Sequence, residues 1–159
     1  SETTQAPDYE QTGQVGKGVN FDGLEYLTID AFNSSEYTTG LYMSAWIKLE
    51  GVSGNQQFMS IQSTGGLGAS FHLLDNNIRA QMYISGTKSA YISNQVSADT
   101  WYHLVSWWDG TTWKVFKNGA EIYSASQSGT ATMSAVGNNR ISDQSWEFQG
   151  GIIDQVMIS

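Results

Sequence analysis

Hydrophobic and polar positions alternate with a period of two along much of the chain, which is typical of β-strands with one buried face. Residues 41–50 show this best. One face of that segment is predicted to be core: Leu41, Met43, Ala45, Ile47 and Leu49. The opposite face carries Tyr42 and Trp46 and is expected to be half-exposed.

Residues 78–84 follow the same pattern. The predicted core positions are Ile78, Ala80, Met82 and Ile84, and the outward positions are Arg79, Gln81 and Tyr83. Other strands are expected at residues 19–21, 26–29, 57–63, 69–74, 90–93, 101–108, 113–117 and 120–124, with a weak one near 135–138 and the last within 146–158. No helical period persists beyond about two turns.

Short turn sequences connect these segments. The pairs Asp109-Gly110 and Asn118-Gly119 divide residues 101–124 into three apolar runs. Asn or Asp followed by Gly tolerates the positive φ angles of tight hairpins, so these runs are predicted to form an antiparallel meander. About eleven or twelve strands in two stacked sheets fit the whole pattern, which makes this an all-β sandwich.

Residues 1–15 differ from the rest of the chain. They are polar, lack any period and contain Pro7, the only proline. We therefore expect an N-terminal arm or linker there, followed by one domain over residues 16–159.

Composition narrows the classes of partner. The 159 residues include no cysteine, 7 basic residues and 15 acidic residues, for a net charge of -8. Because nucleic acid needs a concentrated basic patch, nucleic-acid binding is not expected. Membrane binding is not expected either, since no apolar run is long enough to span and anionic surfaces are disfavoured. Highly sulfated glycans are disfavoured in the same way, unless a metal ion bridges the charges.

Four segments in order carry a resemblance to a known family. They are GKGVNFDG (16–23), LYMSAWIKLEG (41–51), WYHLVSWWDGTTWKVFKNGAEI (101–122) and FQGGIIDQVMIS (148–159). Together they resemble the laminin-G-like and pentraxin-like domains of the concanavalin A-like lectin/glucanase superfamily. The resemblance implies a two-sheet antiparallel jelly roll. It leaves function open, because this fold hosts lectins, sugar-binding modules, adhesion domains and hydrolases.

Catalytic chemistry is not predicted. Glycoside hydrolysis needs two carboxylates about 5 to 10 Å apart, and Glu121, Asp143, Glu147 and Asp154 are isolated from one another in sequence. The chain has only two histidines. The resemblance implies a structural role for His103, because relatives commonly place a histidine there and pair it with backbone.

Asp154 lies within an apolar run and is expected to be buried on the same face as Ile152, Val156 and Ile158. A buried carboxylate needs donors or a cation. Two alternatives are open: backbone N–H groups of the turn at residues 21–23, or a structural Ca²⁺ shared by Asp22 and Asp154. Asp75 with Asn76 and Asn77 is a further possible calcium loop, although a plain turn is favoured.

Six Trp and eight Tyr suggest contact surfaces, because sugar rings stack on exposed aromatic side chains while polar groups bond their hydroxyls. The predicted ligand-binding residues are Arg79, Tyr83, Tyr91 and Trp146. Trp107 and Trp108 are adjacent and must point to opposite sides of their strand.

The preferred hypothesis is a non-catalytic carbohydrate-binding module of a larger extracellular or surface protein, whose partners are a glycan and other domains of that protein. The alternative is a structural or adhesion domain of a cell-surface, bacteriophage tail or virion decoration protein. An unusual glycanase is the third possibility.

Overall fold

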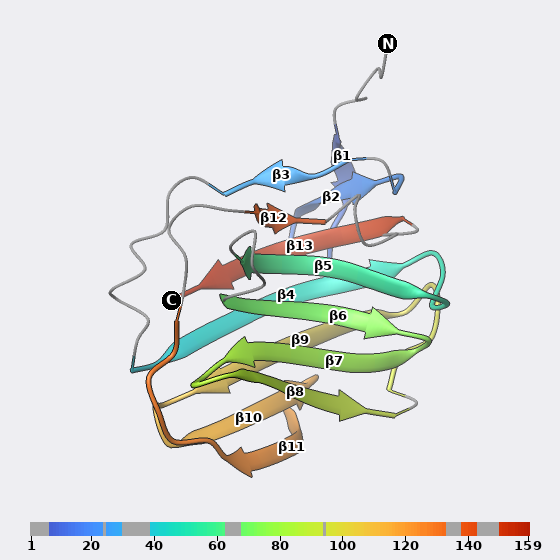
Figure 1. Ribbon diagram of the computed structural model, residues 1–159. Coiled ribbons are helices and arrows are strands. Elements are labelled where there is room, and N and C mark those ends of the chain that lie inside the picture. The colour runs from blue at the N-terminus through green and yellow to red at the C-terminus, as the bar shows by residue number, and fades with distance from the viewer. Residues whose placement is uncertain are drawn as a thin grey trace.

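The computed structural model describes residues 7–23, 25–29, 39–62, 68–93, 95–132, 138–142 and 150–159. Within these ranges the chain forms thirteen strands and no helix, so no helix in them is long and apolar enough to span a membrane. All pairings between strands are antiparallel, and the strands belong to two sheets stacked face to face (Figure 1). The predicted all-β, two-sheet sandwich is confirmed.

The first sheet has seven strands. In spatial order they are β1 (Asp8–Thr12), β2 (Lys17–Phe21), β13 (Gly151–Ile158), β4 (Leu41–Leu49), β9 (Trp101–Trp108), β10 (Thr112–Lys117) and β11 (Ala120–Ser126). The last three of these strands are the predicted meander. Asn118 and Gly119 have φ angles of 51° and 82° and form its second turn, as the sequence pair predicted.

The second sheet has six strands. In spatial order they are β3 (Leu27–Thr28), β12 (Asn138–Ile141), β5 (Asn55–Gln62), β6 (Gly68–Leu74), β7 (Asn77–Tyr83) and β8 (Thr87–Ile92). The weak strand expected near residues 135–138 is β12, which begins where that range ends. Residues 135–137 and 146–149 lie outside the described part of the chain.

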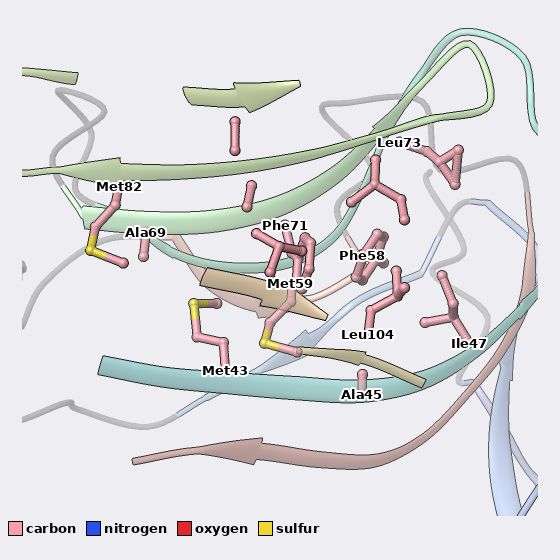
Figure 2. Packing of buried hydrophobic residues seen from close by; sticks show 14 of the residues in the cluster. Met43, Ala45, Ile47, Phe58, Met59, Ala69, Phe71, Leu73, Met82 and Leu104 are labelled. Carbon is pink, nitrogen blue, oxygen red and sulfur yellow. The ribbon is translucent and has the colours of Figure 1, made fainter. Parts of the chain in front are cut away.

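The core lies between the two sheets, as Figure 2 shows. Every predicted core position of residues 41–49 and 78–84 is at most 2% exposed. A β-bulge in β5, opposite the pair His72 and Phe71, turns both Phe58 and Met59 into the core. The rings of Phe58 and Phe71 pack with their centroids 5.2 Å apart.

Residues 8–12 contain more structure than expected. Asp8–Thr12 is strand β1, which pairs with β2 at one edge of the seven-stranded sheet. The expectation of an arm or linker is therefore wrong for these residues. An edge strand needs few buried side chains, because only one of its edges is paired and its faces can stay in water. Tyr9, for example, is 52% exposed.

Asp154 is buried, as predicted, and shares the face of Ile152, but this face is the outer one and not the core face of Ile158. Ile153 is the core residue of that part of β13. Asp154 points to the outer face of the sheet, where its register partner is Trp46. A β-bulge between Asp154 and Met157 then shifts the alternation by one, so that Ile158 pairs with the core residue Met43. The sequence pattern gave no indication of this bulge.

Candidate functional site

A row of polar side chains crosses the outer face of the six-stranded sheet. Successive register pairs join Thr28, Arg140, Ser60, Ser70, Gln81 and Ser89 from β3 to β8. A second row joins Gln57, His72, Arg79 and Tyr91 from β5 to β8. Because alternate residues of a strand point to the same side, these hydroxyl, amide, imidazole and guanidinium groups share one surface, which we call the polar face.

The polar face is accessible at its β7–β8 end. We define the β7–β8 patch as the outward side chains of these two strands: Arg79, Gln81, Tyr83, Thr87, Ser89 and Tyr91. Tyr91 is 57% exposed, and the guanidinium of Arg79 lies over its ring at 5.2 Å from the centroid. Gln81 Nε2 donates a hydrogen bond to Ser89 Oγ at 3.3 Å. The patch thus combines an exposed aromatic ring with several hydrogen-bonding groups and one fixed cation.

The β5–β6 part of the polar face is buried and supports the patch. His72 is 2% exposed, and its Nε2 lies 2.6 Å from Ser70 Oγ in a hydrogen bond. Burial lowers the pKa of His72 to about 3, and the positive charge of Arg79 contributes a smaller part of the decrease. His72 is therefore neutral near pH 7 and acts as a hydrogen-bonding group rather than a second charge.

Three of the four predicted ligand-binding residues lie together on this surface. Arg79 and Tyr91 are direct register partners, and Tyr83 is on the same face of β7, about 13 Å along the strand from Arg79. Trp146 lies outside the described residues. Sequence reasoning missed Ser89 and Thr87, although the period-two pattern of residues 87–92 would have placed both beside Tyr91.

The structure does not bring together the two predicted calcium ligands. Asp154 Oδ2 accepts a hydrogen bond from the backbone N–H of Val15 at 2.8 Å. Val19 pairs with Ile153, so Asp154 lies beside Gly18, about 13 Å along the sheet from Asp22. Backbone N–H bonding was one of the two alternatives, but the donor belongs to the β1–β2 turn rather than to residues 21–23.

The described residues include no group of three His, Asp or Glu side chains that could hold a metal ion. The loop at Asp75 is likewise not part of such a group. It is a tight turn in which Asp75 and Asn76 have φ angles of 46° and 53°. Asp75 Oδ1 accepts from the Gly54 N–H at 2.8 Å. A calcium ion at any of these positions stays a prediction.

The two described carboxylates of the predicted set, Glu121 and Asp154, do not converge for hydrolysis. Glu121 on β11 pairs with Lys114 at 2.7 Å. Asp154 on β13 is four strands away in the same sheet, about 19 Å at the usual strand spacing. This separation is about twice what an inverting glycosidase uses. Asp143 and Glu147 lie outside the described residues.

Aromatic side chains gather on the outer face of the other sheet. We call this the aromatic face and define it by six half-buried residues of β4, β9 and β10: Tyr42, Trp46, Trp101, His103, Trp107 and Phe116. The rings of Trp46 and His103 are stacked with centroids 5.0 Å apart. As predicted, Trp107 and Trp108 point to opposite sides, and Trp108 is in the core.

His103 also has a structural environment. Its backbone N–H donates to Asn118 Oδ1 at 2.8 Å, and its ring packs on Trp46. Partial burial lowers the pKa of His103, so the ring is neutral near pH 7. The backbone of His103 joins the β10–β11 turn to the aromatic face, and its ring is half-buried on the surface rather than buried as predicted.

The sequence matches the family described as the concanavalin A-like lectin/glucanases superfamily over residues 21–159. The chain belongs to this superfamily. No curated protein matches the sequence. Two solved structures illustrate its fold. The binding domain of Paraclostridial mosquitocidal protein 1 is 15% identical with a TM-score of 0.73, over 97% of this chain and 43% of that one. Domain 4 of AbnA, a GH43 extracellular arabinanase from Geobacillus stearothermophilus, was solved in complex with arabinotriose. It is 20% identical with a TM-score of 0.67, over 92% of this chain and 72% of that one.

A third superfamily structure is the mouse laminin α1 chain, domains LG4-5, which is 12% identical with a TM-score of 0.63, over 84% of this chain and 38% of that one. At these identities the likenesses establish the fold and not a shared ligand. The chain spans less than half the length of the toxin and laminin structures, which contain further domains. The first neighbour is described as a binding domain and the second as one domain of an arabinanase.

Proposed function

We propose that the protein is a non-catalytic module that binds a glycan at the β7–β8 patch. One observation carries this proposal: the Arg79 guanidinium and the Tyr91 ring lie together on a surface otherwise made of hydroxyls and amides. A sugar ring has apolar C–H faces and a rim of hydroxyls. Such a ligand needs an aromatic face and several hydrogen-bonding groups in one plane, and the patch offers both.

The strands hold these groups in position before the ligand arrives. Arg79, Gln81 and Tyr83 alternate with core residues at most 1% exposed, so the backbone beneath them is fixed. Groups that are already ordered lose little conformational entropy on binding, and affinity rises accordingly. No bond chemistry is involved: stacking on Tyr91 and hydrogen bonds from Gln81 and Ser89 would supply the affinity.

The test is a glycan array followed by titration of any ligand found, using Tyr91→Ala and a matched control. Tyr9→Ala is that control, because Tyr9 is 52% exposed against 57% for Tyr91 and lies on the other sheet. We expect Tyr91→Ala to weaken binding by about tenfold or more, since stacking on an exposed ring is worth at least about 1 kcal/mol. Tyr9→Ala is expected to leave affinity unchanged. Equal effects of the two substitutions would contradict the proposal.

Calcium is proposed only as a structural ion and is tested in the same experiment. An ion that binds the folded state raises the melting temperature by mass action. Repeating the array and a thermal unfolding scan with calcium and with chelator measures both roles. A melting temperature and a binding profile that do not change with chelator would remove calcium from the account.

The aromatic face supports a second candidate function, a contact with a neighbouring domain or protein. Half-buried tryptophans that share one face of a sheet with other aromatic residues are typical of interface centres. The toxin and laminin structures each continue well beyond the region that matches this chain, so a domain of the same protein is a reasonable occupant. Loss of assembly with a parent protein after Trp107→Ala, without loss of glycan affinity, would support this candidate.

A further inference from the structure

The six-stranded sheet differs in charge from the rest of the chain. Its six strands contain Arg79, Lys88 and Arg140 and no aspartate or glutamate. The strands of the seven-stranded sheet contain four acidic residues and four lysines, so their charges balance: Asp8, Glu10, Glu121 and Asp154 with Lys17, Lys48, Lys114 and Lys117. The whole chain nevertheless carries a net charge of -8.

Local charge decides which ligands approach a small patch, because charges farther away than about 10 Å are largely screened at physiological salt. The composition-based argument against acidic ligands therefore does not extend to the polar face. Among the strands that build this face, every ionisable side chain that is charged near pH 7 is cationic.

Arg79 is the one charged residue of the β7–β8 patch. Its side chain is half-exposed and lies over Tyr91, and its Nε is buried without an acceptor in the described part of the chain. A buried donor without an acceptor is unfavourable. This lowers the cost of turning the guanidinium toward an acceptor that a ligand supplies.

We propose that the β7–β8 patch selects glycans that carry a carboxylate, that is, uronic-acid units, and that Arg79 determines this preference. The inference rests on the proposed glycan-binding function and adds the class of sugar. The planar guanidinium matches a carboxylate with two parallel N–H···O bonds, which a neutral hydroxymethyl group cannot accept in the same way. The neighbouring Tyr91 ring receives the apolar face of the same or the next sugar, and Gln81 and Ser89 bond its hydroxyls.

Isothermal titration calorimetry tests the proposal. The ligands are oligogalacturonate, oligoglucuronate and oligomannuronate, each compared with its methyl ester, and a panel of neutral oligosaccharides. Each acid and ester pair differs in the charge of the carboxyl group. We expect at least one acid to bind about tenfold or more tightly than its ester, which is the usual value of a charge-assisted pair. Arg79→Gln should remove that difference, and Arg79→Lys should keep only part of it because lysine lacks the fork.

Lys88→Gln is the matched control. Lys88 is on the same sheet, but it pairs with the core residue Met82 and does not belong to the patch. It removes the same charge as Arg79→Gln, and thermal unfolding of all variants checks that they fold. Equal losses with Lys88→Gln and Arg79→Gln would show a diffuse charge effect and overturn the role of Arg79.

The remaining outcomes separate the two proposals. If acids and esters bind equally, or only neutral sugars bind, and Tyr91→Ala weakens that binding, the carboxylate preference is overturned and the glycan-binding function stands. If no acid, ester or neutral sugar binds, both proposals are overturned.

Discussion

The outer faces of the two sheets are built differently although they belong to one sandwich. The aromatic face consists of rings that pack against each other, such as Trp46 on His103. The polar face consists of hydroxyl, amide and guanidinium groups in rows, with one strongly exposed ring, Tyr91. The number of aromatic residues on a surface therefore does not by itself locate a sugar site. A site also needs hydrogen-bonding groups around an accessible ring, and the β7–β8 patch has this arrangement.

The two faces also place different demands on the protein beneath them. The polar face requires a histidine to be buried in its neutral form, at His72. The aromatic face lies over a sheet whose inner side holds two enclosed tryptophans, Trp108 and Trp113. Substitutions beneath each face should therefore affect stability in different ways, and the predictions below follow that difference.

The largest expected effect is the pH dependence that His72 produces. Its pKa is about 3 in the folded protein, against 6.5 as the reference value. Between these values the unfolded chain binds a proton that the folded protein does not, so stability falls as the pH decreases from about 6.5 to about 3. The full loss is on the order of 5 kcal/mol.

Urea unfolding measured at several pH values, for the unmodified protein and for His72→Gln, checks this prediction. Glutamine keeps hydrogen-bonding capacity but cannot titrate, so the variant should show a clearly shallower decrease over that range. The same slope in both proteins would mean that another group is responsible and that the polar face does not depend on a neutral His72.

A smaller effect is expected beneath the aromatic face. Trp113 is fully buried, and its Nε1 donates to Ser106 Oγ at 2.9 Å. Trp113→Phe removes buried volume and leaves the Ser106 hydroxyl without its donor, which should destabilise the protein by about 2–3 kcal/mol. Trp107→Phe, the matched change on the surface of the neighbouring strand, should cost less than about 1 kcal/mol. Similar values for the two in denaturant unfolding would contradict the inside-outside assignment.

The smallest of the three concerns the edge of the seven-stranded sheet. A Cβ at Gly13 would lie 2.6 Å from Asp154 Oδ2 and 2.7 Å from the Gly18 backbone nitrogen. Gly13→Ala should therefore disturb the β1–β2 turn and cost about 1–2 kcal/mol, without changing glycan affinity. Gly119→Ala is the comparison, because a Cβ at Gly119 would meet nothing within 4 Å. Its loss of stability measures the cost of the positive φ angle alone. A loss of glycan affinity in Gly13→Ala would mean that the two sheets are not independent in binding.

Most of the fold could be predicted from the sequence, because alternation of apolar residues and Asx-Gly turns are local properties. The strand over residues 101–108 has the predicted bounds, and the core positions of residues 41–49 are those expected. The superfamily could also be predicted, from four segments in order. Strand β1 could not, because an edge strand with both faces near water has no apolar period.

The candidate site could be predicted only in part. Arg79 and Tyr83 followed from alternation within one strand, but their relation to Tyr91 depends on the register of β7 with β8. Asp154 was predicted to share a face with both Ile152 and Ile158. It shares only that of Ile152, because a β-bulge after Asp154 shifts the alternation without a sequence marker. The burial of Trp113 was not predicted either, because it depends on the face that β10 turns to the core when it pairs with β9.

The most direct test of the account is an NMR titration of the backbone amides with the oligosaccharide that binds best. The account predicts that shifted amides cluster in residues 77–92, the segment that contains the β7–β8 patch. Shifts clustered in residues 41–49 and 101–108 would place the ligand on the aromatic face and contradict it.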